Sequence, residues 1–160
     1  MKFRLFYRGR LKSNGGAKEK HSIRKAFHPQ LKSLWLQEPL KHLSTVDGIP
    51  IMNKLPGLVK KVNNQKFLPL VCHDFATVAE LDIVFLRPGE PGSLIKYGGD
   101  IDNRIKTLLD GLRVPLKNSE LPSKNEMDRE EDILYCLFED DARLTHLSIT
   151  TDRLLDYDDI

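Results

Sequence analysis

Two carboxylates, a carboxamide and an amine stand within seven residues in the second half of the chain. Asp100, Asp102, Asn103 and Lys106 supply these groups, where the apolar helical repeat of residues 101–112 begins. Carboxylates two residues apart at a strand-to-helix junction can converge on one hard cation such as Mg²⁺. A lysine one turn further along can face a phosphate held by that cation. The pattern indicates metal-dependent phosphodiester chemistry.

A site of this kind also needs a carboxylate from another part of the chain. Glu139, Asp140 and Asp141 stand just before a predicted strand and are the candidates. Two Mg²⁺ ions held by such groups can activate a water molecule and stabilise the leaving oxygen of a phosphodiester. We therefore expect Mg²⁺ as the cofactor, with Mn²⁺ as a substitute.

The same residues also have a purely structural interpretation. Asp is favoured at the N-cap of a helix, so Asp100 or Asp102 can serve as a cap. Asp102, Lys106 and Asp110 recur every four residues, which makes ordinary ion pairs of about 0.2–0.5 kcal/mol each. At 100° per residue these three side chains share a flank of the apolar stripe, with Asn103 beside Asp110. Spacing alone does not separate the two interpretations.

Basic and acidic residues are separated along the chain. The 160 residues carry a net charge of only +2, yet residues 1–66 hold fifteen Lys and Arg against three Asp and Glu. The remaining residues hold ten against twenty. A basic half suits a polyanion and an acidic half suits cations, as expected of a protein that needs both nucleic acid and Mg²⁺. Pairing of opposite charges across the fold explains the same separation.

The densest basic stretch is the candidate surface for nucleic acid, because contacts to phosphates dominate non-specific affinity. Its members are Arg8, Arg10, Lys12, Lys18, Lys20, Arg24 and Lys25. A solvated loop and helix face is the open alternative.

Hydrophobic periodicity predicts one α/β domain of mixed α+β type over residues 1–160, with two main helices packed on a small mixed sheet. The second and third of the predicted strands are expected to pair as a hairpin, and the strands cover residues 2–7, 67–72, 77–86, 133–138 and 143–151. Helices are predicted from 18 to about 46 and from 102 to 113. Within the first, Pro29 is expected to start a new helix and Pro39 to kink or divide it. The segments 47–66 and 117–132 are predicted loop insertions.

Composition narrows the class of protein. With 40% hydrophobic and 30% charged residues, the chain is expected to be a soluble globular protein. No apolar run approaches the roughly 18 residues of a membrane helix, and the first residues lack the apolar region of a secretory signal. Cys72 and Cys136 lie far apart without metal-type spacing, so buried free thiols in a reducing cytoplasm are expected, with a disulfide as the alternative.

The acidic motifs resemble those of a known family. The pattern Asp-x-Asp-Asn-x-x-Lys-x-x-x-Asp at residues 100–110 is similar to the signature of the RusA family of Holliday junction resolvases, and Asp140-Asp141 before a strand is similar to that family's second motif. The resemblance covers residues 78–112 and 139–150. The chain departs from the family in the 29 residues between Asp110 and Asp140, and in Arg143, where the family has Gln.

The resemblance implies a role for each matching residue. Asp100, Asp102 and Asp141 would ligate Mg²⁺, and Lys106 would be the catalytic lysine that contacts the scissile phosphate. The supporting residues would be Asn103, Asp110 and Asp140. The implied protein is a homodimer of small mixed α/β subunits that resolves four-way DNA junctions in recombination and repair.

Two other functions fit the same sequence. One is a non-catalytic protein that binds nucleic acid or a partner on the same fold. The other is a nuclease for flaps, other branched DNA or RNA.

Overall fold

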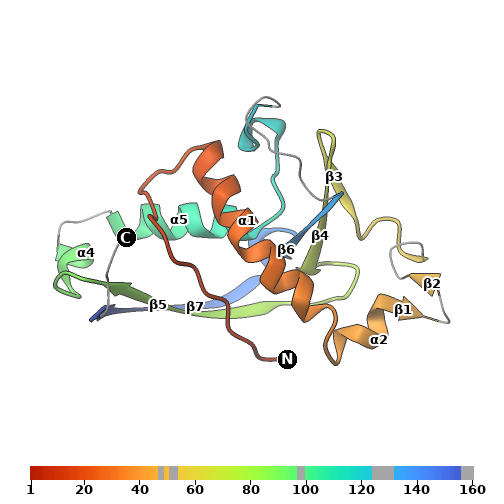
Figure 1. Cartoon of the computed structure of the whole chain (residues 1–160), viewed down its shortest axis with the longest axis horizontal. Helices are drawn as coiled ribbons and strands as arrows, with labels where there is room; N and C mark the ends of the chain where they lie inside the picture. The colour runs from red at the N-terminus through yellow and green to blue at the C-terminus, as the bar shows by residue number, and fades with distance from the viewer. Residues whose placement is uncertain (47–48, 51–53, 97–99, 124–131, 156–160) are drawn as a thin grey trace.

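The computed structural model describes residues 1–46, 49–50, 54–96, 100–123 and 132–155. Helices and strands both occur, in the mixed α+β arrangement expected from the sequence (Figure 1). Two long helices, α1 (Ala17–Leu34) and α5 (Asp100–Leu112), lie against each other. The short helices are α2 (Leu40–Ser44) and α4 (Ser93–Lys96), and the 3₁₀ turns are η1 (Asn118–Glu120) and η2 (Asp141–Arg143).

Helix α1 begins directly after Gly16, whose N–H donates to the Glu19 carboxylate (3.1 Å). Its buried stripe contains Ile23, Phe27 and Leu31. Pro29 lies inside α1, so the prediction that it starts a new helix is wrong. The helix also ends earlier than predicted, and Pro39 precedes the separate helix α2, as one of the two outcomes expected for that proline.

The strands of the described residues form three small sheets. In the largest, β4 (Gln65–Val71) lies between antiparallel β3 (Lys60–Val62) and parallel β6 (Ile133–Phe138). A second sheet, the β5–β7 ribbon, pairs β5 (Ala79–Arg87) in parallel with β7 (Leu144–Arg153). The third pairs β1 (Thr45–Val46) with β2 (Ile49–Pro50).

The predicted hairpin of 67–72 with 77–86 is therefore wrong. Strands β4 and β5 are close in sequence, but each takes a distant partner, β6 or β7. The physical reason lies in burial. Residues 67–71 of β4 are all buried, so this strand is covered by neighbours, whereas β5 alternates between half-buried and exposed positions.

Three other predicted segments differ from the structure. Residues 2–7 form no strand: Phe3, Leu5 and Tyr7 alternate toward the core as expected, but the backbone of Phe6 bonds the Gln30 side chain. The predicted loop 47–66 contains β3 and the start of β4. In the predicted loop 117–132, η1 is followed by buried residues 121–122, and residues 124–131 lie outside the described residues.

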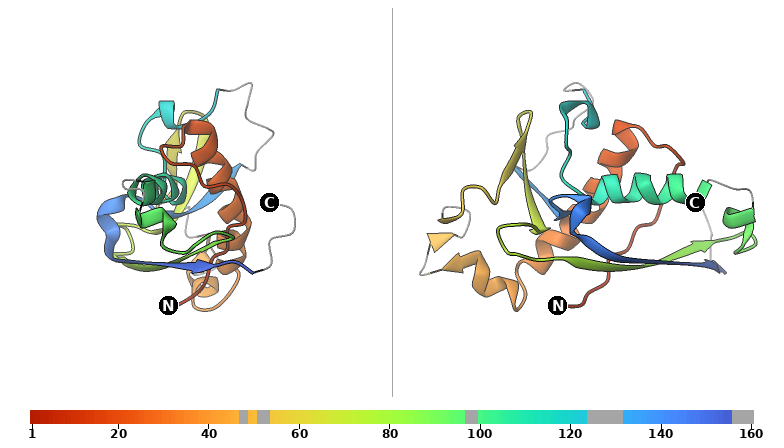
Figure 2. Two further views of the ribbon diagram at one scale, coloured as in Figure 1. Left: turned by 90° about the vertical axis from the view of Figure 1, so that its left-hand side faces the viewer. Right: turned by 180° about the vertical axis from the view of Figure 1, so that it is seen from behind.

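Close backbone contacts hold α5 against α1 and against the loop before α1 (Figures 1 and 2). A Cβ added to Gly111 would lie 2.6 Å from Ile23 Cγ2 on α1, and one added to Gly15 would lie 2.6 Å from Thr107 Cγ2. These two glycines let the segments approach closely. The position of every side chain on the flank of α5 depends on this packing.

Two further sequence predictions concern the cysteines and the membrane. Cys72 and Cys136 are both buried free thiols, which confirms the part of the prediction that concerns their burial and their free state. Among the helices that the structure describes, none combines the length and the apolar character needed to span a membrane.

Candidate functional site

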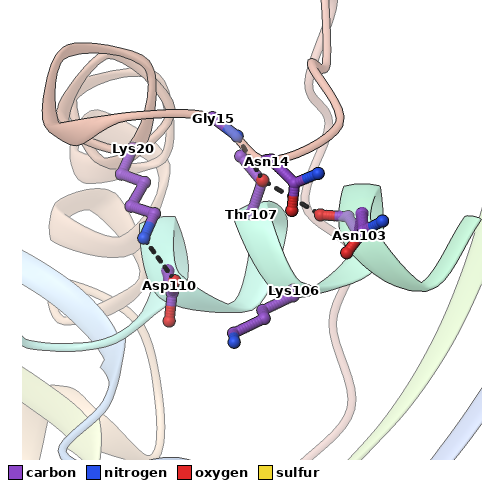
Figure 3. A pocket seen from close by; sticks show the side chains of 7 residues that line it. All are labelled: Asn14, Gly15, Lys20, Asn103, Lys106, Thr107 and Asp110. Carbon is purple, nitrogen blue, oxygen red and sulfur yellow. Dashed lines mark hydrogen bonds and ion pairs between the residues drawn. The ribbon is translucent and has the colours of Figure 1, made fainter. Parts of the chain in front are cut away.

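A cavity of about 240 Å³ lies where the loop before α1 meets the flank of α5 (Figure 3). It brings together side chains from three segments, and its lining is polar: Asn14, Gly15, Lys20, Asn103, Lys106, Thr107 and Asp110. Three of the residues predicted from the sequence, Asn103, Lys106 and Asp110, therefore share one cavity. Lys20, which was predicted as a nucleic-acid contact, joins them.

Hydrogen bonds fix one wall of the cavity. The Gly15 N–H donates to Thr107 Oγ1 (2.9 Å), and that hydroxyl donates to the carbonyl of Asn103 (3.0 Å) (Figure 3). Asn14 adopts a left-handed conformation (φ 52°), which Asn tolerates better than most residues. The loop is thereby held so that its backbone and its amide side chain border the α5 flank.

Lys106 and Asp102 are exposed on this flank, one turn apart. Within the part of the chain that the structure describes, neither side chain has an ion-pair or hydrogen-bond partner. Lys106 lines the cavity, and Figure 3 shows its side chain extending from α5 toward the side of Asp110 and away from Asn14 and Gly15. An unpaired ammonium at a polar cavity is well suited to contact an anion.

Asp110 is buried, and each of its carboxylate oxygens contacts a basic side chain. Lys20 Nζ lies 2.6 Å from Oδ2, while Arg113 donates to Oδ1 from Nη2 (2.7 Å) and from Nε (3.1 Å). Burial alone would raise the pKa of Asp110, but the hydrogen bond and charge of Lys20, together with Arg113, hold that pKa below its usual value. Asp110 is therefore ionised and tightly held.

Arg113 joins Asp110 to the second acidic motif. Its Nε lies 3.5 Å from Asp141 Oδ2, so one nitrogen contacts both Asp110 and Asp141. The two carboxylates can be no further apart than the sum of those two contacts. Arg113 also bonds Glu120 of η1 (3.1 Å), which ties the predicted acidic insertion to the same point. Neither Arg113 nor Glu120 was predicted from the sequence, where the only signal was the spacing of three residues from Asp110 to Arg113.

Asp141 is about half exposed, and its surroundings disfavour the charged carboxylate. Partial burial raises its pKa, and the neighbouring charges of Asp110, Asp140 and Glu120 raise it further, against the lowering effect of Arg113. The carboxylate form is thus less favourable here than in water. Carboxylates with a raised pKa beside other acids are common at functional sites.

The structure does not bring Asp100 to Asp141. Asp100 pairs with Arg104 (2.8 Å), whereas Asp141 pairs with Arg113, nine residues or two and a half helical turns later. Asp100 begins α5, whereas Arg113 directly follows its last residue, Leu112, so the two ion pairs lie toward opposite ends of this 13-residue helix. Sharing of one cation by Asp100, Asp102 and Asp141 would need a rearrangement of this structure. In the described residues, no group of three or more His, Cys, Asp or Glu is arranged to hold a metal ion.

Local interactions occupy two of the predicted acids. The pKa of Asp100 is lowered by the hydrogen bond and charge of Arg104 and by a hydrogen bond from Ser13. Asp140 caps η2 by accepting a hydrogen bond from the N–H of Ala142 (2.8 Å). Capping and i,i+4 pairing therefore explain the local positions of these two residues.

The predicted basic stretch is mostly exposed, with one clear exception. Arg24 is 1% exposed and donates to the carbonyls of Asp110 (2.9 Å) and Arg113 (3.3 Å) at the end of α5. The last carbonyls of a helix lack hydrogen-bond donors within the helix, and the Arg24 guanidinium provides donors for them. Its prediction as a nucleic-acid contact is therefore wrong. The exposed members are Arg8, Arg10, Lys12, Lys18 and Lys25.

Comparisons with known proteins add no relative: no family model, no curated protein and no solved structure matches this chain.

Proposed function

We propose that the protein is a Mg²⁺-dependent, structure-selective endonuclease that acts as a homodimer on branched DNA such as a four-way junction. The sequence pattern of residues 100–110 and 140–141 supports the proposal. So does the cavity, where Lys106 and Lys20 present amines and Asn14 and Asn103 present amides. Such donors suit a phosphate, because a negatively charged oxygen accepts charge-assisted hydrogen bonds from each of them.

Lys106 is the residue on which the proposal depends most. Its side chain is exposed, has no partner among the described residues and lines the cavity. A lysine that serves only to support α5 would be expected to pair with Asp102 or Asp110, four residues away on either side. Asp110 instead takes Lys20 and Arg113. Lys106 is thus available to stabilise negative charge that develops on a phosphate.

The arrangement of carboxylates does not fit a Mg²⁺ centre as it stands. Mg²⁺ takes carboxylate oxygens and waters in octahedral geometry, but Asp100 and Asp110 are already paired with arginine or lysine, and Asp141 contacts Arg113. The metal requirement therefore rests on the sequence pattern. Calorimetric titration with Mn²⁺ tests it directly, with Asp102→Asn and Asp141→Asn as the variants expected to weaken binding.

A matched pair of lysine variants tests the role of Lys106. Lys106→Ala is expected to bind a synthetic four-way junction as the unchanged protein does, and to cleave it on the order of a hundredfold more slowly. Lys117→Ala removes an exposed lysine outside the cavity and should leave both properties unchanged. Loss of junction binding in Lys106→Ala, with an unchanged rate at saturation, would refute the catalytic role.

The paired carboxylates favour a second candidate function, a protein that binds nucleic acid without cleaving it. The arginine and lysine side chains that contact Asp100, Asp110 and Asp141 are then permanent structural partners. This function predicts junction binding that is independent of Mg²⁺ and no cleavage at any metal concentration.

A further inference from the structure

The outer face of α1 carries lysines that are separated by smaller residues. Lys18, Lys25 and Lys32 are exposed and recur every seven residues, which places them in one line about 10.5 Å apart. Ser22 and Pro29 share this exposed face. Figures 1 and 2 show α1 along one side of the molecule. The face therefore offers a row of lysine side chains beside a surface made of short side chains.

The N-terminal segment borders the other margin of the same face. The Phe6 N–H donates to Gln30 Oε1 (2.9 Å), and Gln30 Nε2 donates to the Phe6 carbonyl (2.8 Å). The Tyr7 ring packs against Phe27, with ring centroids 5.9 Å apart. At 100° per residue, Gln30 lies 140° around α1 from Lys25. The segment and the lysine row thus enclose the exposed face between them.

Phe6 points outward from this anchored backbone. Its side chain is 74% exposed, between the exposed residues Arg4 and Arg8, while Leu5 and Tyr7 turn toward the core. Glu19, the one acidic residue of α1, is paired with Lys12. A large aromatic ring held in water among cations, on a backbone fixed by two hydrogen bonds, has the features of a stacking platform for an unpaired base.

We infer that this face of α1 binds an unpaired DNA strand, whose phosphates contact the lysine row and one of whose bases stacks on Phe6. The inference rests on the proposed function and deepens it, since it names a substrate with a single-stranded arm. A duplex does not use Phe6, because its bases are already stacked on one another. Stacking on an aromatic side chain tolerates any base, since every base has a π-face.

The stacking role is tested with a labelled oligothymidylate and a labelled blunt duplex of equal length, by fluorescence anisotropy. Phe6→Ala is expected to weaken binding of the oligothymidylate about tenfold and leave the duplex unchanged, and Phe6→Trp is expected to bind as Phe6 does. Phe6 is exposed, so the substitutions should not affect folding, which circular dichroism checks. An equal effect on both ligands, or none on either, overturns the role of Phe6.

The phosphate contacts are tested by the salt dependence of binding. Lys25→Gln/Lys32→Gln should reduce the slope of log K against log salt for the oligothymidylate by about 1.4, since each neutralised phosphate contributes about 0.7. Lys61→Gln/Lys117→Gln makes the same charge change at exposed positions elsewhere and should not alter the slope beyond the effect of net charge. Equal slopes in the two double variants overturn the lysine row as the contact.

These binding measurements separate the inference from the proposed nuclease. Asp102→Asn and Lys106→Ala should bind the oligothymidylate normally whether or not the protein cleaves DNA. Normal oligothymidylate binding without junction cleavage removes the nuclease and leaves the strand-binding face. Cleavage with no effect of Phe6→Ala on any ligand removes the face and leaves the nuclease.

Discussion

Replacing Arg113 with methionine tests the account of the buried charge network. The side chains of Arg113 and Asp110 are each 6% exposed, and Arg113 also bonds Glu120 and the Val114 carbonyl (3.1 Å). Removal of one partner of a buried ion pair costs about 3–5 kcal/mol, because the other charge stays buried without compensation. Lys20 still pairs with Asp110 in the variant, so we expect a loss near the lower end, about 3 kcal/mol.

Urea denaturation monitored by circular dichroism measures this loss. With a slope of about 2 kcal/mol per molar urea, the midpoint should fall by about 1.5 M. Arg104→Met is the matched control, since Arg104 also pairs with an aspartate of α5, but at 26% and 33% side-chain exposure. Its loss should stay near or below about 1 kcal/mol. Losses of similar size in the two variants would refute the reasoning from burial.

Three further predictions follow from the same packing and electrostatics. Gly111→Ala should destabilise the protein by about 1–3 kcal/mol in urea denaturation, because its Cβ would meet Ile23 at 2.6 Å; no change would contradict the close contact of α1 with α5. Asp141→Asn should raise the thermal midpoint at pH 7. Because the pKa of Asp141 is raised in the folded protein, the unchanged protein loses stability as pH increases from the unfolded pKa of about 3.9 through the folded value. The advantage of the variant over the unchanged protein must therefore vanish below about pH 4, where Asp141 is protonated in both states. Cys136 should resist alkylation by iodoacetamide in the native protein at pH 8, since burial raises its pKa to about 12, and mass spectrometry of the native and unfolded protein checks this.

The helix that carries the acidic motif could be predicted because its signal is local. The apolar stripe through Ile105, Leu108 and Leu112 repeats at helical spacing, and the same period places Asp102, Lys106 and Asp110 on one flank. Both properties depend only on residues within a few turns. The prediction of α5 was therefore confirmed within two residues at its start.

Strand pairing could not be predicted in the same way. The four residues between 72 and 77 favour a hairpin, but β4 and β5 pair with β6 and β7, which are more than sixty residues away. Alternating and continuous apolar runs show how deeply a strand is buried, not which strand covers it. The pairing of β6 with β4 and of β7 with β5 also determines where Asp141, which lies between β6 and β7, stands relative to α5.

Buried charges were the other feature that the sequence concealed. Arg24 belongs to a basic stretch and has the composition of a surface position, yet its guanidinium completes the end of α5. Arg113 likewise acts through contacts with Asp110, Glu120 and Asp141 that a spacing rule does not reveal. Such roles depend on the tertiary position of unpaired carbonyls and carboxylates.

The central proposal is tested most directly by cleavage of a synthetic four-way DNA junction in Mg²⁺. The unchanged protein should nick the junction, Asp102→Asn should lose activity on the order of a hundredfold or more, and Asp82→Asn, which alters an exposed aspartate of the β5–β7 ribbon, should cleave normally. Equal rates for the unchanged protein and Asp102→Asn, or no cleavage by the unchanged protein at any concentration of Mg²⁺ or Mn²⁺, would contradict the proposal.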